Sequence, residues 1–362
     1  MLYHLLFQLR DLWFGFNVFK YITFRASMAA LTAFIICVVI GPVIIKWLKD
    51  FKIGQYVRKE HVDELLDFHA AKEGTPTMGG LLVIFSVLFS VLLWCRLDGI
   101  LVYLVMGSML WLGGIGFLDD YIKLRDKSAK GLQGMTKLLG QTVLALIIGI
   151  FVVFYKPVGT ELYVPFLKNS VLNLGLLYIA FVWLVIVGTS NAVNLTDGLD
   201  GLAIGCTTFV CLTLSVMAYV TGNAVMSGYL NVFYLPGAGE LTVFLAALVG
   251  AGLGFLWYNG HPASVFMGDT GSLALGGTIA TIAVLLKKEF LLLIIGGIFV
   301  MESLSVMLQV ASYKLRKKRI FLMSPIHHHF QIKGWPESKI TIRFWIISAI
   351  LALLGLASLK VL

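Results

Sequence analysis

The sequence predicts an all-α polytopic membrane protein with ten transmembrane helices. Of its 362 residues, 59% are hydrophobic and only 13% are charged, and the mean hydropathy is +0.91. Such a composition is far too apolar for a soluble globular domain. Apolar runs of about 18 residues, enough to cross a bilayer as a helix, recur along the whole chain. The runs are continuous, whereas the strands of a membrane β-barrel alternate apolar and polar residues, so a barrel is excluded.

A single integral membrane domain is expected over residues 1–362. Residues 1–22 mix Leu, Phe and Trp with a few charges, which is typical of an amphipathic helix that lies in the membrane interface. The transmembrane bundle is expected over residues 24–359. Its ten predicted spans are residues 24–47, 77–94, 100–118, 138–155, 174–189, 202–220, 241–257, 271–286, 290–313 and 341–359.

Basic residues favour one side of the predicted membrane. The connections on that side contain 18 Lys and Arg, against 5 on the other side. By the positive-inside rule, the basic side is cytoplasmic and both termini lie outside. The three longest connections, residues 49–76, 119–137 and 314–340, are all cytoplasmic, so the functional site is expected there. The net charge of +9 reflects this bias and requires no nucleic-acid partner.

Five aspartates follow the ends of apolar spans on the cytoplasmic side, where anionic groups beside a bilayer mark a functional site by default. The first two, Asp119 and Asp120, belong to the motif FLDDY. Adjacent residues of a helix point about 100° apart. We therefore expect separate roles, one carboxylate holding a metal ion and the other handling a proton or a phosphate. The alternative is a solvated span end beside Lys123 and Arg125.

The second motif, NAVNLTDGLDG, carries a stripe of polar side chains. Asn191, Asn194, Asp197 and Asp200 recur at every third position, so in a helical turn they would share one face. The glycines allow a ligand to approach the backbone closely, and the break before the next span leaves N–H groups free for a phosphate. A purely structural turn needs neither two amides nor two carboxylates, so the stripe indicates a binding site.

The third motif, YNGHPASVFMGDTGS, places Asp269 where a helix begins. A plain N-cap is therefore one explanation for this aspartate. Asn259 and Phe266 add an amide and an aromatic face, both suited to a planar base. The motif contains no Lys or Arg, so it offers Asp269 no local ion-pair partner.

The last motif is the basic loop KLRKKRIFLMSPIHHHF. The five cations within residues 314–319 are typical of a loop anchored to anionic lipid headgroups. The histidine run at residues 327–329 is a poor zinc site, because neighbouring imidazoles cannot all reach one ion, but it suits donation to a phosphate or a nucleobase. Glu302 lies within a predicted span and is expected to cap polar groups at a bend or to border a lipid groove.

Together these motifs resemble the phospho-N-acetylmuramoyl-pentapeptide transferases. FLDDY, NAVNLTDGLDGLA, VFMGDTGSL and PIHHHF occur in this order, together with GTPTMGG at residues 74–80. Several long motifs in order are far more specific than any single short pattern, and the resemblance covers nearly the whole chain. The triple histidine and the intact NAVNLTDGLDG favour this family over the related polyprenyl-phosphate N-acetylglucosamine-1-phosphate transferases.

The resemblance implies a bacterial inner-membrane enzyme of peptidoglycan synthesis, with periplasmic termini and an active site on the cytoplasmic face. Such an enzyme transfers phospho-MurNAc-pentapeptide from UDP-MurNAc-pentapeptide to undecaprenyl phosphate, a membrane lipid, and yields lipid I and UMP. A magnesium ion (Mg²⁺) is the implied cofactor, and a homodimer is the implied assembly.

The resemblance also implies roles for individual residues. Asp119 matches the aspartate proposed to deprotonate the lipid phosphate, Asp120 matches its acidic neighbour, and Asp269 matches the magnesium ligand. These three are the expected catalytic residues. The expected substrate-binding residues are Lys72, Thr77, Asn191, Asn194, Asp197, Asp200, Asn259, Phe266, Gln309, His327, His328 and His329.

Two positions depart from the family pattern. Glu73 follows Lys72 where a second basic residue is usual, and His261 precedes Pro262 where an aromatic residue is common. Both departures bear on the nucleotide end of the expected substrate site, and neither involves the aspartates.

The mechanism and the functional class each have alternatives. The lipid phosphate can attack directly, or the reaction can pass through an aspartyl-phosphate. We favour direct transfer, because a phosphate monoester needs little activation beyond the loss of its last proton. An ion-coupled transporter would be expected to show internal repeats and sites at the membrane midplane, and a non-catalytic lipid-binding scaffold would not need five clustered aspartates.

Overall fold

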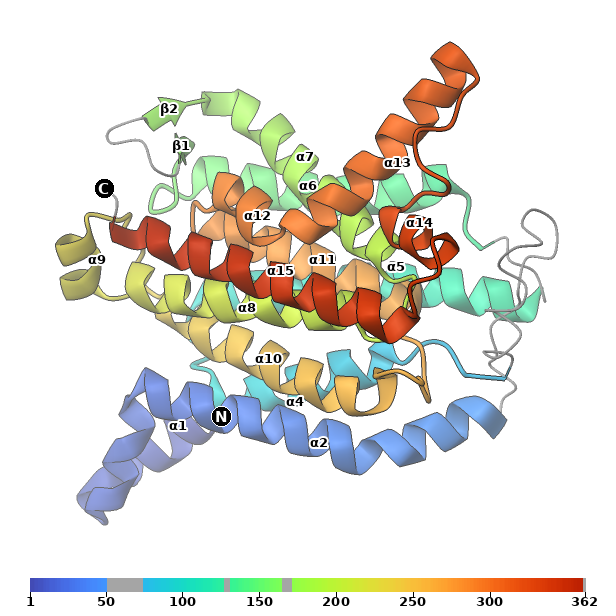
Figure 1. Cartoon of the computed structure of the whole chain (residues 1–362). Coiled ribbons are helices and arrows are strands. Elements are labelled where there is room, and N and C mark those ends of the chain that lie inside the picture. Colours follow the sequence, from blue (N-terminus) through green and yellow to red (C-terminus); the bar gives the residue numbers. More distant parts are fainter. Residues whose placement is uncertain (51–73, 127–130, 165–170, 361–362) are drawn as a thin grey trace.

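The computed structural model describes residues 1–50, 74–126, 131–164 and 171–360, and its regular structure is almost entirely helical (Figure 1). Within these residues, nine helices are long and apolar enough to cross a membrane, which confirms an all-α polytopic membrane protein. They are α2 (Ile22–Asp50), α5 (Ile100–Arg125), α6 (Gly134–Phe154), α7 (Tyr178–Thr196), α8 (Leu202–Thr221), α10 (Gly239–Asn259), α11 (Gly268–Leu285), α13 (Gly297–Arg316) and α15 (Glu337–Ala357).

Two of the ten predicted spans differ from expectation. The span predicted over residues 77–94 is α4 (Gly80–Trp94), which has only 15 residues. The span predicted over residues 290–313 is divided at Gly296 into α12 (Glu289–Ile295) and α13. Neighbouring glycines are a recognised cause of helix breaks. After this break, α13 projects from the bundle, and the short α14 (Ile326–Ile332) returns beneath it (Figure 1).

Helix α11 forms the core of the bundle. Every residue from Thr270 to Leu285 is buried, as expected for a helix that is surrounded on all sides. Helices α5 and α7 pack directly against α11, α8 packs against α10, and α2 covers α10 on the outside (Figure 1). The core therefore holds the first turn of α11 in a fixed place, and this turn carries Asp269.

Glycines allow the helices around α11 to approach it at backbone contact. A side-chain carbon added at Gly116 of α5 would lie 2.1 Å from the carbonyl oxygen of Asp269, and one added at Gly80 of α4 would lie 2.2 Å from the backbone nitrogen of Gly271. Small residues at helix crossings permit such close packing within membranes. Three helices thus meet at the residues that begin α11.

The N-terminal segment forms three short helices, whereas a single amphipathic helix was expected. These are α1 (Leu2–Leu6), η1 (Phe7–Asp11) and η2 (Phe14–Lys20). The terminal ammonium of Met1 donates to the carbonyl of Leu92 at 2.7 Å. Nearby, the buried Arg25 and Glu240 form an ion pair at 2.6 Å, which joins the ends of α2 and α10.

The end of the bundle that holds the C-terminus also carries a small hairpin and α9 (Ala224–Leu230) (Figure 1). Strand β1 (Glu161–Tyr163) pairs antiparallel with β2 (Val171–Asn173). The Nζ of the buried Lys287 donates to the carbonyl of Gly159 at 2.6 Å, and this bond ties the connection before the hairpin to the end of α11.

The packing at Gly116 can be tested by adding a single methyl group. We expect Gly116→Ala to reduce the free energy of unfolding by about 1–3 kcal/mol, the usual effect of overpacking, because the methyl group would collide with the backbone of Asp269. The measurement is the thermal midpoint in detergent micelles. Gly114→Ala on the same helix is the matched control, since no atom lies within 4 Å of the added carbon. Equal midpoints for the two variants would contradict the close approach.

Candidate active site

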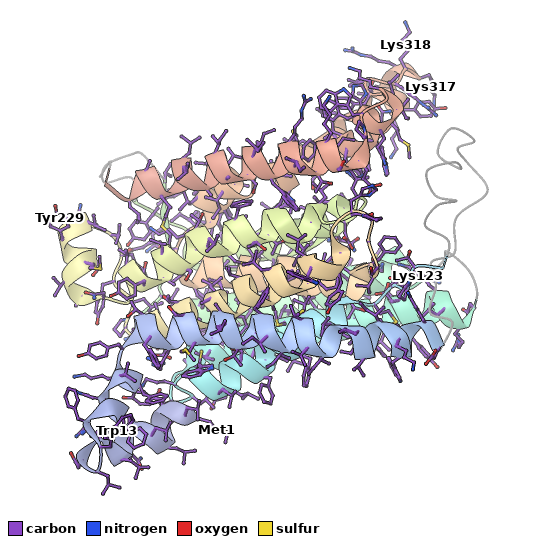
Figure 2. The ribbon with its side chains drawn as sticks, turned by 60° about the horizontal axis from the view of Figure 1, so that its bottom comes forward. Met1, Trp13, Lys123, Tyr229, Lys317 and Lys318 are labelled. Carbon is purple, nitrogen blue, oxygen red and sulfur yellow. The ribbon has the colours of Figure 1, made fainter. Side chains whose placement is uncertain are left out.

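Three aspartates converge where α5 and α11 meet. One carboxylate oxygen from each of Asp119, Asp120 and Asp269 lies within 4.8 Å of the other two. Asp119 is fully buried and Asp120 is 3% exposed, so the alternative of a solvated span end is wrong. Figure 2 shows Lys123, the next cation along α5, at this end of the bundle, and Tyr229 of α9 at the opposite end.

Asp120 caps helix α11 from the neighbouring helix. Its Oδ2 accepts hydrogen bonds from the backbone nitrogen of Thr270 at 3.0 Å and from the Thr270 hydroxyl at 2.8 Å, and its Oδ1 accepts from the backbone nitrogen of Asp269 at 3.3 Å. The first N–H groups of a helix lack intrahelical partners, and the helix dipole favours a negative charge there. The alternative that Asp269 is a plain N-cap is therefore wrong, because Asp269 lies inside the first turn of α11 and Asp120 accepts from the free N–H groups of that turn.

Gly268 makes this cap possible. Its φ of +73° lies in the left-handed region that favours glycine. A side-chain carbon at Gly268 would also lie 2.6 Å from Oδ2 of Asp120 and 2.8 Å from the hydroxyl oxygen of Thr77. Thr77 thus lies beside the aspartates, as expected for a residue of the substrate site.

Two lysines lie between the carboxylates of Asp119 and Asp269. Lys123 Nζ is 2.5 Å from Oδ2 of Asp119 and 3.1 Å from Oδ2 of Asp269. Lys137 Nζ, from α6, is 2.9 Å from Oδ1 of Asp119 and 2.6 Å from Oδ2 of Asp269. Neither lysine was assigned a role from the sequence. The i,i+4 spacing of Asp119 and Lys123 could have indicated their contact, whereas no local signal marks Lys137.

The polar stripe of the second motif divides between two environments. Asn194 Nδ2 donates to Oδ1 of Asp269 at 2.9 Å and to the hydroxyl of Ser272 at 2.8 Å, so this amide belongs to the aspartate cluster. Asn191 Nδ2 donates to Oε1 of the buried Gln141 on α6 at 2.9 Å. Gln141 was not anticipated from the sequence, and through it α6 holds the stripe in place.

Asp197 lies just beyond the end of α7 and near the cluster. Burial, followed by the negative charges of Asp269 and Asp120, raises the pKa of Asp197 to about 8. Its carboxyl is therefore largely protonated at neutral pH. This proton compensates for the crowding of acidic groups, because like charges at short range disfavour ionisation.

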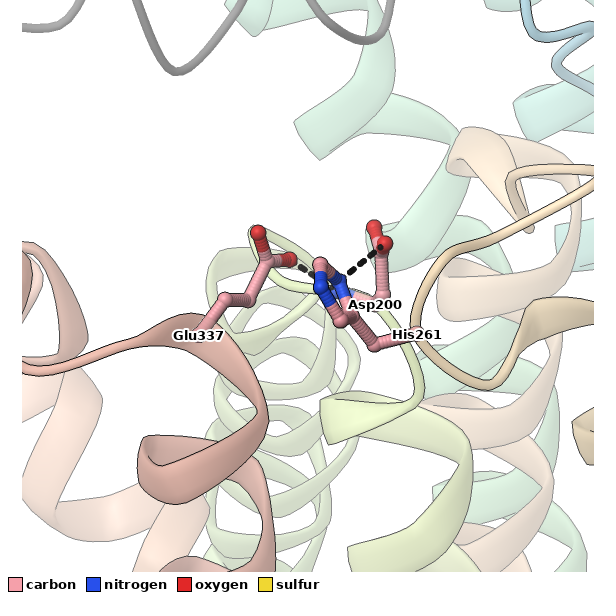
Figure 3. A group of neighbouring side chains, drawn as sticks. All are labelled: Asp200, His261 and Glu337. Atoms are coloured by element: carbon pink, nitrogen blue, oxygen red, sulfur yellow. Dashed lines mark hydrogen bonds and ion pairs between the residues drawn. The ribbon is translucent and has the colours of Figure 1, made fainter.

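Asp200 belongs to a different group, shown in Figure 3. Its Oδ2 accepts a hydrogen bond from the backbone nitrogen of Ala263 at 3.1 Å and lies 3.1 Å from Nδ1 of His261. The backbone nitrogen of Asp200 donates to Oε1 of Glu337 at 2.7 Å. Asp200 therefore clamps together the turn between α7 and α8, the loop before α11 and the start of α15. His261, a departure from the family pattern, takes part in this clamp.

Asn259 and Phe266 lie on the same side of the bundle as this clamp. Asn259 is 4% exposed, its Oδ1 accepts from the backbone nitrogen of Gly201 at 3.1 Å, and its Nδ2 donates to the carbonyl of Val265 at 2.8 Å. The backbone of Phe266 bonds to Pro76 and Gly79 at 2.8 Å each. Both residues thus join loops around the site, and their contact with a nucleoside stays a prediction. Lys72 lies outside the described residues.

The three histidines do not share one environment. His327 is fully buried and its Nδ1 lies 3.1 Å from Oε1 of Glu302, so Glu302 pairs with a histidine, whereas capping of a bend was expected. His328 Nδ1 contacts Oε1 of Gln331 at 2.7 Å. His329 Nδ1 accepts from the backbone nitrogen of Leu322 at 3.1 Å, which shapes the loop between α13 and α14.

Gln309 also shapes that loop. Its Oε1 accepts from the backbone nitrogens of Ile320 and Phe321 at 3.0 Å each, and its Nε2 donates to the carbonyl of Phe321 at 2.9 Å. His327 lies against Gly198 of the second motif, since a side-chain carbon added at Gly198 would lie 2.4 Å from Nε2 of His327.

Comparisons with known proteins agree on one family. The family model described as "Glycosyl transferase family 4" matches residues 101–287, and a "Phospho-N-acetylmuramoyl-pentapeptide-transferase signature 1" matches residues 72–84. The chain is similar to proteins named phospho-N-acetylmuramoyl-pentapeptide-transferase. That of Citrifermentans bemidjiense is 51% identical over 99% of both chains, that of Desulfotalea psychrophila is 51% identical over 99% of both, and that of Endomicrobium trichonymphae is 49% identical over 100% of both.

The raised pKa of Asp197 predicts a pH-dependent stability. Between about pH 4 and 8 the folded state binds more protons than the unfolded state, so the free energy of unfolding falls as the pH rises. We expect Asp197→Asn to remove this contribution and to raise the thermal midpoint at pH 7.5, in detergent without divalent cations. A gain of about 1 kcal/mol corresponds to roughly 2 °C.

Asp98, outside the bundle core, provides a control for which the thermal midpoint should change in the opposite direction. Hydrogen bonding to Arg96 lowers the pKa of Asp98, so Asp98→Asn should lower the midpoint at pH 7.5. An Asp197→Asn variant with the same pH dependence as the unmodified protein would show that Asp197 is ionised at neutral pH.

Proposed function

Because the chain belongs to the phospho-N-acetylmuramoyl-pentapeptide transferase family, we propose that it transfers phospho-MurNAc-pentapeptide from UDP-MurNAc-pentapeptide to undecaprenyl phosphate, with formation of lipid I and UMP. The single observation that carries this proposal is the identity of about half of all residues over nearly the full length of the relatives. The signature at residues 72–84 favours this activity over the related polyprenyl-phosphate N-acetylglucosamine-1-phosphate transferases and over an ion-coupled transporter.

We propose that the aspartate cluster binds Mg²⁺. Carboxylate oxygens are the ligands that this ion prefers, and oxygens of three aspartates lie within 4.8 Å of one another. Asp269 would be the principal ligand, with Asp119 beside it, because both contact lysine side chains that can move away, whereas the oxygens of Asp120 bond to the fixed backbone of α11. When bound, the ion would neutralise charge on the pyrophosphate and on the departing UMP.

The lysines provide the second source of positive charge. Lys123 and Lys137 bridge Asp119 and Asp269. Their ammonium groups are long and flexible, so they can turn from the carboxylates to phosphate oxygens of the substrate. Preorganised charges of this kind stabilise the charge that develops during phosphoryl transfer.

Direct transfer fits the carboxylates better than a covalent intermediate. In direct transfer, an oxygen of the lipid phosphate attacks the sugar-linked phosphorus, a new P–O bond forms, and the P–O bond to UMP breaks. Asp120 is poorly suited to act as a nucleophile, because its oxygens accept hydrogen bonds from α11. Asp119, whose carboxylate faces the lysines, is the candidate base for the last proton of the lipid phosphate. A phosphorylated Asp119 or Asp120, trapped with UDP-MurNAc-pentapeptide alone, would defeat direct transfer.

The turn that follows α7 is the proposed site for the nucleotide-sugar. Asp197 and Gly198 lie next to the aspartate cluster and the histidine group, and Asp200 fixes the other end of the turn. Phe266, which is partly exposed, is proposed to contact the nucleotide-sugar directly, whereas the buried Asn259 and His327 are proposed to support the turn through Gly201 and Gly198.

We place the enzyme in the bacterial inner membrane with ten crossings and periplasmic termini. We count α4 as the tenth crossing, because its 15 residues extend for roughly 22 Å and pack against the longer spans α2 and α10. Lys123, Lys317 and Lys318 share one end of the bundle, whereas Trp13 and Tyr229 lie toward the other (Figure 2), which supports a cytoplasmic active site. The homodimer rests on the family resemblance alone.

The central test is the release of UMP. Purified protein supplied with UDP-MurNAc-pentapeptide, undecaprenyl phosphate and Mg²⁺ should release UMP, and chelation of the ion should stop the release. We expect Asp269→Asn to lower kcat by at least about 100-fold, the usual loss when a group that stabilises the transition state is removed. An unmodified, folded protein that releases no UMP would rule out the proposed reaction.

The role of Lys137 predicts a second effect. Lys137→Ala should lower kcat by about 100-fold, because one preorganised cation is lost, and should also lower the Mg²⁺ concentration for half-maximal activity, because a competing cation is removed. The exposed Lys314, at the end of α13, provides the control variant Lys314→Ala. An unchanged Mg²⁺ requirement in Lys137→Ala would mean that lysine and metal ion do not compete for the carboxylates.

A further inference from the structure

Glu302 and His327 form an ionisable pair in the interior of the protein. Both side chains are fully buried, and His327 Nδ1 lies 3.1 Å from Glu302 Oε1. Glu302 belongs to α13, close to its break from α12, whereas His327 belongs to α14. A buried polar group is costly unless it is paired, so this contact holds α14 against α13.

Stability alone is a poor explanation for such a pair. Apart from their mutual 3.1 Å contact, the carboxylate oxygens of Glu302 and the ring nitrogens of His327 have no hydrogen-bond partner in the part of the chain that the structure describes. Replacement of a buried ion pair by apolar residues of similar size is often neutral or stabilising. A role outside stability therefore accounts better for two buried polar side chains whose hydrogen-bonding capacity is so poorly used.

The other ring nitrogen of His327, Nε2, connects this pair to the turn after α7, which is the proposed site for the nucleotide-sugar. His327 Nε2 lies against Gly198, where even a methyl carbon would approach to 2.4 Å. Gly198 directly follows Asp197, whose pKa responds to the charges of Asp269 and Asp120. The far end of the turn is held by the contacts of Asp200. His327 thus supports the end of the turn that lies nearest to the aspartate cluster.

We propose that Glu302 is a positioning residue, whose carboxylate holds His327 with Nε2 against Gly198 and so fixes the turn that presents Asp197 to the nucleotide-sugar. The orientation of a histidine by a carboxylate on its other nitrogen is a general device of active sites. The inference rests on the proposed function of this turn. It assigns a role to Glu302, which does not touch the substrate itself.

The first test is Glu302→Gln, assayed for UMP release with both substrates varied. We expect kcat/KM for UDP-MurNAc-pentapeptide to fall by about 10- to 100-fold, as for other partners that orient a functional histidine. The change should be mainly in KM for the nucleotide substrate, since the turn binds it in the ground and transition states alike. KM for undecaprenyl phosphate should be unchanged.

Glu289→Gln is the matched control. Glu289 is a second buried glutamate, 2% exposed, and it bonds to the hydroxyl of Tyr178 at the opposite end of the bundle. This variant should affect folding yield at most, with kcat and KM unchanged for each folded molecule. If Glu302→Gln behaves in the same way, or if it lowers kcat alone, the positioning role is refuted.

A double variant separates positioning from stability even where the single variant fails to fold. Glu302→Met combined with His327→Phe replaces the pair by apolar groups of similar size, so the thermal midpoint should equal or exceed that of the unmodified protein. KM for UDP-MurNAc-pentapeptide should nevertheless rise by about 10-fold or more. A double variant with normal KM would overturn the inference.

The assay of the unmodified protein distinguishes a failure of the proposed function from a failure of the role assigned to Glu302. Absence of UMP from the unmodified protein contradicts the proposed function. Normal UMP release by the unmodified protein and by both Glu302 variants contradicts only the role of Glu302.

Discussion

The close approach of α5 to the first turn of α11 is the constraint on which the site depends. Gly116 and Gly268 remove the side chains that would hold the two backbones apart, and Asp120 then reaches the free N–H groups of α11. Once this cap is formed, the other positions follow. Asp119, the preceding residue on α5, points about 100° away, toward the lysines, and Asp269 is fixed by the helix that Asp120 caps.

Most of the fold could be predicted from the sequence, because membrane spans are defined by local length and apolarity. Those properties do not reveal where a helix breaks. Gly296 hardly changes the hydropathy of its surroundings, so the division between α12 and α13 was missed. The predicted span began three residues before α4, because hydropathy does not show that the backbone nitrogens of Gly79 and Gly80 bond to Phe266 and Met267. The N-terminal segment was misjudged for a related reason, since its contact with the ends of α2 and α4 depends on tertiary structure.

Residues of the candidate site could be predicted where they belong to a sequence motif. They could not be predicted where their role depends on a contact between distant segments of the chain. Asp119, Asp120 and Asp269 come together as expected. Lys137, Gln141 and Glu337 could not be assigned, because each acts through a partner far away in the sequence. Spacing also grouped residues that the structure separates, since Asp200 clamps three loops while Asn194 joins the aspartates.

Lys123 and Lys137 lie between Asp119 and Asp269, so the protein itself supplies counter-ions for these carboxylates. Substrate phosphates that bind these lysines would exchange one set of ionic partners for another, and pairing matters here because an unpaired buried charge is highly unfavourable. Because these pairs are largely shielded from solvent, dissolved salt screens them much less than it screens surface charges. The electrostatics of the cluster should thus vary little with the ionic strength of the surrounding solution.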